Sequence, residues 1–135
     1  MTAAGYSGTP LPKKLGIKPG HRVLLLGAPE GFSLGELPEA VQVVRALRGE
    51  ADVLVSFHLE RRDLERRLPA LRRAMVPNAG LWIAWPKKAS KVPTDLDENI
   101  VRDLALANVL VDNKVAAIDE VWSGLRLVIR VRDRP

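Results

Sequence analysis

Three short, continuous apolar runs limit the possible folds of this chain more than any other feature. They span residues 22–27, 52–57 and 81–85. Runs of this length without polar alternation are typical of strands that are covered on both faces, as in parallel sheets. Helical patterns follow the second and third runs, so strands and helices alternate along the chain. The sequence therefore predicts an α/β fold with a Rossmann-like, mostly parallel sheet in a three-layer sandwich.

Two helices are predicted from apolar residues at three- and four-residue steps, over about residues 62–75 and 95–107. Pro69 lies inside the first helix, and because proline removes a backbone hydrogen bond we expect a kink or a later start there. Thr94 is placed to cap the second helix. The residues expected to be buried are Leu64, Leu68, Leu71 and Met75 in the first helix, and Leu96, Ile100, Leu104 and Ala107 in the second.

Residues 37–48 fit two patterns. Apolar residues recur at helical spacing, Pro38 suits a first turn and Gly49 suits the position after the last turn, which favours a helix. The stretch 41–44 is rich in valine and fits a short strand equally well. We prefer the helix narrowly.

Both ends of the chain differ from its centre. Residues 1–20 are predicted to form an arm with one short helical turn, and residues 21–135 form a single domain, as a chain of 135 residues suggests. Two strand-like runs, 114–122 and 125–132, flank Ser123-Gly124 and predict an antiparallel hairpin. Arginines alternate with apolar residues in the second run, so we expect it at the edge of the sheet.

Composition excludes several classes of protein. The chain has no cysteine, which removes disulfides, thiolate catalysis and cysteine-bound metals. No apolar run approaches the roughly 20 residues that span a bilayer, and no signal-peptide pattern opens the sequence, so we expect a cytoplasmic protein without a membrane partner. The net charge of +5 favours anionic partners, whereas an aromatic content of 4% leaves few rings to stack on bases.

The second half of the chain resembles class I methyltransferases that use S-adenosylmethionine. The resemblance rests on the strand 52–55, the arginine-rich helix after it, the turn and strand 75–83, and the terminal hairpin. In that family a glycine-containing turn precedes the fifth strand, and Asn78-Ala79-Gly80 is similar to it. The resemblance implies a methyltransferase-like sheet that is closed by a reversed final strand.

The first half departs from that family. A Gly-x-Gly-x-Gly cofactor loop is expected after the first strand, but residues 27–31 read Gly-Ala-Pro-Glu-Gly. Only residues 28–51 separate the first two strands, which is too short for the two strand–helix units that the family inserts there. The adenosine-binding wall is therefore predicted to be missing, although Glu36 or Glu50 could replace the acid that holds the ribose.

The whole chain also resembles a small bacterial family, common in actinobacteria, that is known as a domain of unknown function. Segments that carry this similarity include 5–11, 85–90, 111–115 and 122–126. This resemblance implies no mechanism.

Ligands of open α/β sheets bind outside the carboxyl ends of the strands, which defines the candidate ligand site here. Its residues are Gly27, Glu30, Gly31, His58, Trp85, Lys87, Lys88 and Lys91. The lysines suit a phosphate or an acidic partner, and Trp85 could form the floor of their loop. His58 could act as a general base, but we favour an isolated surface histidine. The two histidines are expected at opposite strand ends, so no metal site is predicted.

Arginines of the first predicted helix form a second, weaker candidate surface, for nucleic acid, through Arg62, Arg66 and Arg73. A solvated helix face is the simpler interpretation of the same residues.

The sequence thus predicts a methyltransferase-like domain that binds an anionic small molecule, a nucleotide or a protein partner, without catalytic residues and without a resident cofactor. One alternative is an S-adenosylmethionine-dependent methyltransferase with a shortened cofactor pocket. Another is a nucleic-acid accessory protein that uses the arginine-rich helix.

Overall fold

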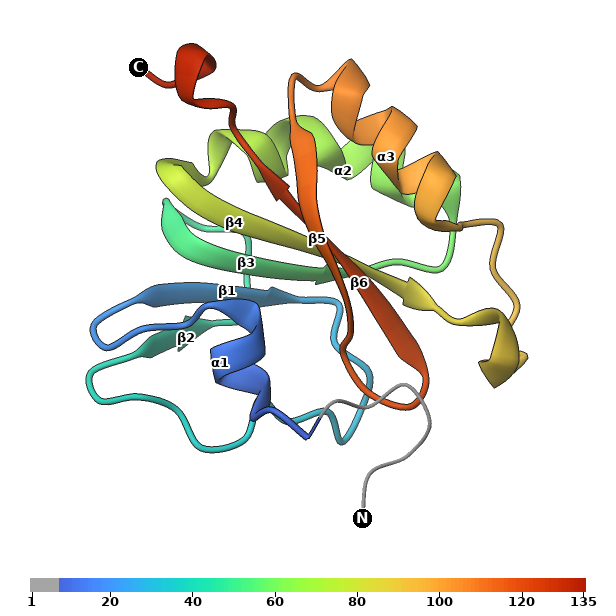
Figure 1. Cartoon of the computed structure of the whole chain (residues 1–135), viewed down its shortest axis with the longest axis horizontal. Coiled ribbons are helices and arrows are strands. Elements are labelled where there is room, and N and C mark those ends of the chain that lie inside the picture. The colour runs from blue at the N-terminus through green and yellow to red at the C-terminus, as the bar shows by residue number, and fades with distance from the viewer. Residues whose placement is uncertain (1–7) are drawn as a thin grey trace.

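The computed structural model describes residues 8–135, and its centre is one six-stranded sheet (Figure 1). The strands lie in the order β2-β1-β3-β4-β6-β5. Strands β1 to β4 are mutually parallel, and β6 is antiparallel to both of its neighbours. The strand bounds are Arg22–Leu26 (β1), Gln42–Val44 (β2), Ala51–Phe57 (β3), Met75–Pro86 (β4), Val111–Ala117 (β5) and Trp122–Val128 (β6). The predicted α/β class with a mostly parallel sheet and a terminal antiparallel hairpin is confirmed.

Helices cover the sheet unequally (Figure 1). The helices α2 (Arg61–Arg73) and α3 (Glu98–Ala107) lie on one face, and the short α1 (Leu11–Leu15) lies on the other. Consecutive residues of β1 enter two separate cores: Leu24 and Leu26 pack below α2 and α3, while Val23 and Leu25 pack with Leu15 of α1. This is why the first strand reads as a continuous apolar run.

The helix preferred for residues 37–48 is wrong. The segment contains the short strand β2, whose register pairs Val43 with Val23 of β1. Residues 28–41 cross from β1 to β2 without an α-helix. Valines favour the extended backbone, and the free edge of β1 supplies hydrogen-bond partners that the sequence pattern does not reveal. The chain therefore has one short strand, and no strand–helix pair, between β1 and β3.

Three predicted boundaries also need correction. Helix α2 runs without a break through Pro69, because its buried leucines dock on the sheet on both sides of the proline. The expected turn at residues 77–80 belongs to β4, where the pairing with β3 shifts register. Asp97, not Thr94, caps α3 by accepting a hydrogen bond from the Ile100 amide.

The predicted buried face of α3 is confirmed in part, since Leu96 and Leu104 are buried and Ile100 packs against the same core. Val101, Leu104 and Ala105 are buried, whereas Ala107 is exposed. The first helix was predicted more closely: Leu64, Leu68 and Leu71 are all buried, and Met75 is buried at the start of β4.

The terminal hairpin turns earlier than predicted. Residues 118–121 connect β5 to β6, and the Asp119 carboxylate accepts the amides of Val121 and Trp122. Gly124 lies within β6, where a Cβ atom would sit 2.8 Å from Ile118 Cδ1 and 3.0 Å from Trp82 Cε3. Strand β6 is internal and β5 forms the edge, which reverses the predicted order. The sequence therefore suggested a turn at Gly124, whereas close packing against Ile118 and Trp82 is what leaves no room for a side chain there.

Candidate functional site

An opening at the carboxyl edge of the sheet lies where the strand order changes direction. The chain leaves β1 for β2 on one side and leaves β3 for β4 on the other side, so the connections that follow these two neighbouring strands diverge. Such a switch point is where open α/β sheets bind ligands. A cavity of about 490 Å³ occurs there, within the range of small-molecule sites. We call it the switch-point cavity; its lining residues are Gly27, Pro29, Phe57, His58, Leu59, Glu60, Arg62, Asp63, Arg66 and Trp122.

Gly27 ends β1 and lets the backbone approach β3 closely. Its φ of 69° lies in the left-handed region, and an added Cβ atom would stand 3.0 Å from the Phe57 carbonyl oxygen. Both conditions favour glycine. The absence of a side chain at this position helps keep the cavity between β1 and β3 open.

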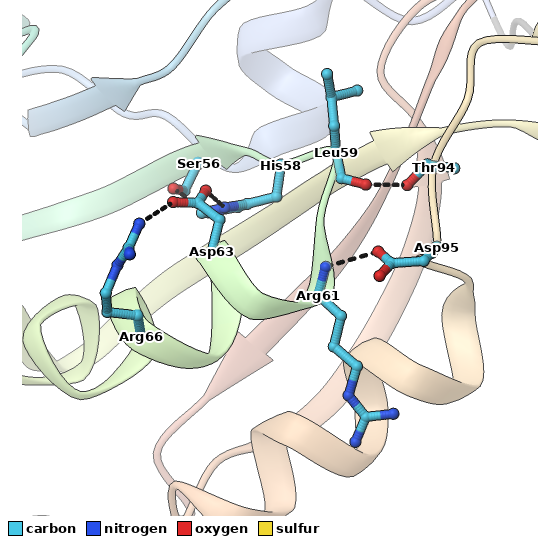
Figure 2. A network of polar contacts seen from close by, with 8 residues as sticks. All are labelled: Ser56, His58, Leu59, Arg61, Asp63, Arg66, Thr94 and Asp95. Atoms are coloured by element: carbon cyan, nitrogen blue, oxygen red, sulfur yellow. Dashed lines mark hydrogen bonds and ion pairs between the residues drawn. The ribbon is translucent and has the colours of Figure 1, made fainter.

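A chain of hydrogen bonds joins Ser56, His58 and Asp63 (Figure 2), and the last two of these residues line the cavity. His58 Nε2 lies 2.7 Å from Ser56 Oγ, and His58 Nδ1 lies 2.7 Å from Asp63 Oδ2. Since a carboxylate only accepts, Nδ1 carries the proton and Nε2 accepts from the Ser56 hydroxyl. The His58 residue is only 3% exposed. The prediction of an isolated surface histidine is therefore wrong.

The two titratable members of this chain influence each other. Burial lowers the pKa of His58, although the adjacent Asp63 carboxylate opposes that effect. Burial by itself would raise the pKa of Asp63, but the hydrogen bonds from His58 and Arg66 and their electrostatic attraction outweigh it, so the pKa is lowered. At neutral pH the arrangement is a neutral imidazole beside a carboxylate.

The order Ser56-His58-Asp63 has the connectivity of a hydrolase triad, but its chemistry is different. Ser56 is 1% exposed inside β3 and does not line the cavity. A nucleophile must reach the reacting atom of a substrate. Ser56 therefore serves to orient His58, and His58 in turn orients Asp63, which faces the cavity.

The loop between β3 and α2 is held from the opposite side (Figure 2). Thr94 Oγ1 donates to the Leu59 carbonyl oxygen, and Asp95 Oδ1 accepts the Arg61 amide at 2.6 Å. Two residues of the β4–α3 connection thus fix the loop that forms the rim of the cavity.

The structure divides the predicted ligand site. Gly27 and His58 line the switch-point cavity, whereas Glu30 does not and Gly31 lines a neighbouring cavity. Trp85 is buried in the core below α2 and α3, so it does not form the floor of the lysine loop. Lys87, Lys88 and Lys91 do not line the cavity either.

Two of the three arginines proposed for nucleic acid, Arg62 and Arg66, line the cavity, and Arg73 does not. Part of the positive charge of α2 is paired within the helix, since Arg61 contacts Glu65 and Arg66 contacts Asp63.

Sequence reasoning missed Asp63 and Trp122. Asp63 lies five residues after His58, in the first turn of a helix that follows a strand, and this spacing was a usable signal. Trp122 reaches the cavity only because β6 runs antiparallel beside β4, which no local pattern reveals.

Solved structures with a similar fold include several methyltransferases. A SAM-dependent methyltransferase from Aquifex aeolicus matches with a TM-score of 0.58 and 18% identity, over 87% of this chain and 86% of that chain. Magnesium protoporphyrin IX methyltransferase from Synechocystis PCC 6803, with bound SAM, matches with a TM-score of 0.58 and 14% identity, over 82% and 70%. The 1,6-didemethyltoxoflavin-N1-methyltransferase of Burkholderia thailandensis gives 0.58 and 17%, over 87% and 73%.

The fold is that of the class I methyltransferases. The predicted methyltransferase-like sheet is confirmed at this level. No protein-family model matches the sequence, and no curated protein is similar to it.

The fit of S-adenosylmethionine to the switch-point cavity differs between the two halves of that molecule. For the methionine half, Glu60 and Asp63 suit the sulfonium cation and the ammonium group, the rings of Phe57 and Trp122 suit a cation, and Arg62 suits a carboxylate. The sulfonium-bearing half therefore fits the residues present.

The ribose has no equivalent partner. In the described chain β2 is followed by Arg45 instead of an acid. Glu50 directly precedes β3, at the amino edge, where its carbonyl oxygen accepts from Arg22. Glu36 lines the neighbouring cavity with Gly31. Neither glutamate lines the switch-point cavity, so the proposed replacement of the ribose acid is not found there.

Two features are absent from residues 8–135. No helix in this range is long and apolar enough to cross a membrane. No three acidic or histidine side chains come together in it as a metal ion would require.

Proposed function

We propose that the switch-point cavity binds S-adenosylmethionine and that the chain acts as a small methyltransferase. The observation that carries the proposal is the position of the cavity, at the ends of β1 and β3 in a methyltransferase fold. Among the similar proteins described above, one is named as a SAM-dependent methyltransferase and another is a methyltransferase with bound SAM. The proposal favours the catalytic alternative over the non-catalytic reading of the sequence.

The residues of the cavity have separate roles in this proposal. Bound S-adenosylmethionine supplies an electrophilic methyl group. Phe57 and Trp122, whose rings meet edge-to-face at 5.0 Å, form an apolar wall beside the sulfonium. Asp63 is held as a carboxylate by His58 and accepts from the cationic half of the molecule, while Arg62 pairs with its carboxylate. Gly27 permits close approach at the end of β1.

Isothermal titration calorimetry of the full chain with S-adenosylmethionine and S-adenosylhomocysteine tests binding. Gly27→Ala should weaken binding at least tenfold, because the new Cβ atom narrows the cavity. Gly20→Ala is the matched control: Gly20 also has a positive φ, but nothing lies within 4 Å of its added Cβ atom and it does not line the cavity. Absence of binding by the unmodified chain contradicts the proposal.

Transfer of labelled methyl groups to a cell extract tests catalysis. Incorporation that depends on the chain and falls in Gly27→Ala supports a methyltransferase. Tight binding of S-adenosylmethionine without transfer contradicts the catalytic part of the proposal alone.

One observation favours a second function, a non-catalytic domain for an anionic small molecule, nucleotide or protein partner. Strand β2 has only three residues and is followed by Arg45 instead of an acid, and neither Glu36 nor Glu50 lines the switch-point cavity. Native mass spectrometry of the chain purified from its own cells tests this function: a co-purifying anionic ligand other than S-adenosylmethionine supports it. Membership of the small bacterial family named above stays a prediction.

A further inference from the structure

A second concave surface, separate from the switch-point cavity, is lined by cationic residues. It has a volume of about 270 Å³ and lies between α1 and the β5–β6 hairpin. We call it the basic cavity; it is lined by Lys13, Lys14, Leu15, Gly16, Asn113, Lys114 and Arg126. It shares no lining residue with the switch-point cavity. Four of its seven lining residues are cations, and no described residue that lines it is acidic.

Two of these cations face each other across a pair of strands. Lys114 of β5 is the register partner of Arg126 of β6. Like charges directly opposite each other on antiparallel strands are destabilising. The register shifts between Asp112 and Lys114, so a bulge at Asn113 redirects the side chains beside it. The arrangement brings positive charges together where ordinary pairing would separate them.

The third cation comes from α1, about one hundred residues earlier in the chain. Lys14 is 7% exposed, and its Nζ donates to the Ala117 carbonyl oxygen at 2.9 Å. Lys114 Nζ approaches the Lys14 carbonyl oxygen at 3.3 Å, which joins α1 to β5. Burial and the neighbouring charges of Lys114 and Lys87 lower the pKa of Lys14. Lys14 thus adds a positive charge to the basic cavity beside that of Lys114.

The Arg126 side chain occupies the space above Gly80, which has no side chain of its own. A Cβ atom on Gly80 would lie 2.5 Å from Arg126 Nε, so the guanidinium crosses over this glycine. Arg126 Nη1 donates a long hydrogen bond, 3.4 Å, to Asn113 Oδ1. The planar donor set of arginine matches the oxygens of a phosphate.

We propose that the basic cavity binds a small phosphate-type polyanion, such as pyrophosphate or the phosphate chain of a nucleotide. The small, concave shape and converging cations favour a compact ligand, and none of the described residues that line the cavity is an aromatic one that could stack on a base. The site recognises the phosphates and not the group attached to them.

Binding of inorganic pyrophosphate to the full chain, measured by calorimetry at fixed ionic strength, tests the proposal. Lys114→Gln combined with Arg126→Gln should weaken binding at least tenfold. The control combines Arg48→Gln with Arg73→Gln, which removes the same charge from two exposed positions outside the cavity and should keep the original affinity. Equal losses in both pairs, or no binding by the unmodified chain, overturn the proposal.

Gly80→Ala provides a test without a change in charge. Because the added methyl group displaces the Arg126 guanidinium, pyrophosphate binding should fall while all four cations remain. Far-ultraviolet circular dichroism checks that each variant is folded. If folded Gly80→Ala binds as the unmodified chain does, Arg126 is not a ligand and the proposal fails.

Two further ligands distinguish the source of the phosphates. Inorganic triphosphate and ATP should bind with affinities within threefold of each other, because the adenosine finds no partner in the cavity. A much tighter binding of ATP that survives the double substitution places the nucleotide elsewhere and contradicts the proposed site. Chloride at the same ionic strength should produce no binding signal.

Discussion

Truncation of Asp63 tests whether the Ser56-His58-Asp63 chain is built as described. In Asp63→Ala the His58 Nδ1–H loses its acceptor at 2.7 Å. A buried donor without a partner costs about 1–3 kcal/mol. Because the Asp63 side chain is 40% exposed, water can reach part of the vacated space, so we expect the lost hydrogen bond to contribute near the lower end, about 1 kcal/mol, in addition to the effect of the lost charge.

Asp63→Asn separates the hydrogen bond from the charge. Its amide oxygen can still accept from Nδ1–H, but the negative charge near the start of α2 is lost, which costs about 0.3–1 kcal/mol in such positions. Urea unfolding at pH 7.5 should therefore rank the unmodified chain above Asp63→Asn and Asp63→Ala last. The difference between the two variants isolates the hydrogen bond.

Nuclear magnetic resonance of the His58 ring provides the decisive measurement. The unmodified chain should show the Nδ1–H tautomer, and the pKa of His58 should fall further in both variants, because the Asp63 charge raises it. An Nε2–H tautomer, or unfolding free energies that do not differ among the three proteins, would refute the reasoning.

Three other outcomes follow from the packing and the charges. Gly124→Ala should lower the free energy of unfolding by about 1–3 kcal/mol through overpacking. Adding Ile118→Val to this variant should recover part of the loss, since it removes the methyl group that lies 2.8 Å from the new Cβ atom. Strictly additive effects of the two substitutions in urea titrations contradict this contact. The free energy of unfolding should decrease as the pH falls below 6.5, because the pKa of His58 is lowered in the folded chain and the unfolded chain therefore binds this proton first. It should decrease again below pH 3.8, because the pKa of Asp63 is also lowered in the folded chain. Thermal midpoints measured from pH 8 to 3 check the sign, and a midpoint that rises on acidification rejects it. Asp97→Ala should cost about 0.5–2 kcal/mol by removing the cap of α3, and an unchanged midpoint would contradict the cap.

Local sequence patterns predicted the structure correctly where the burial of a residue follows from the period of its own strand or helix. Both faces of β1 and β3 are buried, so each reads as an uninterrupted apolar run. The stripe of leucines in α2 faces the sheet as predicted, since helical spacing places them on one side. Pro69 was misleading because its propensity cost is smaller than the burial of the leucines on either side.

Local sequence patterns failed where the role of a residue depends on its contact with another element of the fold. Gly124 is small because Ile118 and Trp82 press on it, but the sequence presented it as a hairpin turn. His58 was judged a surface residue because its partner depends on how α2 docks against β3. The helix proposed for residues 37–48 gave way to β2 because the edge of β1 was available.

By itself the sequence determined the class of fold, the parallel core strands and the shortage of chain between the first and second buried strands. These follow from hydrophobic periodicity and length, which are properties of neighbouring residues. Only the tertiary structure decided which side chains meet: it brought Asp63 to His58, moved Trp85 into the core, and placed Lys14 beside Lys114. The reason is that such contacts depend on strand order and on the docking of helices, and residues up to one hundred positions apart take part in them.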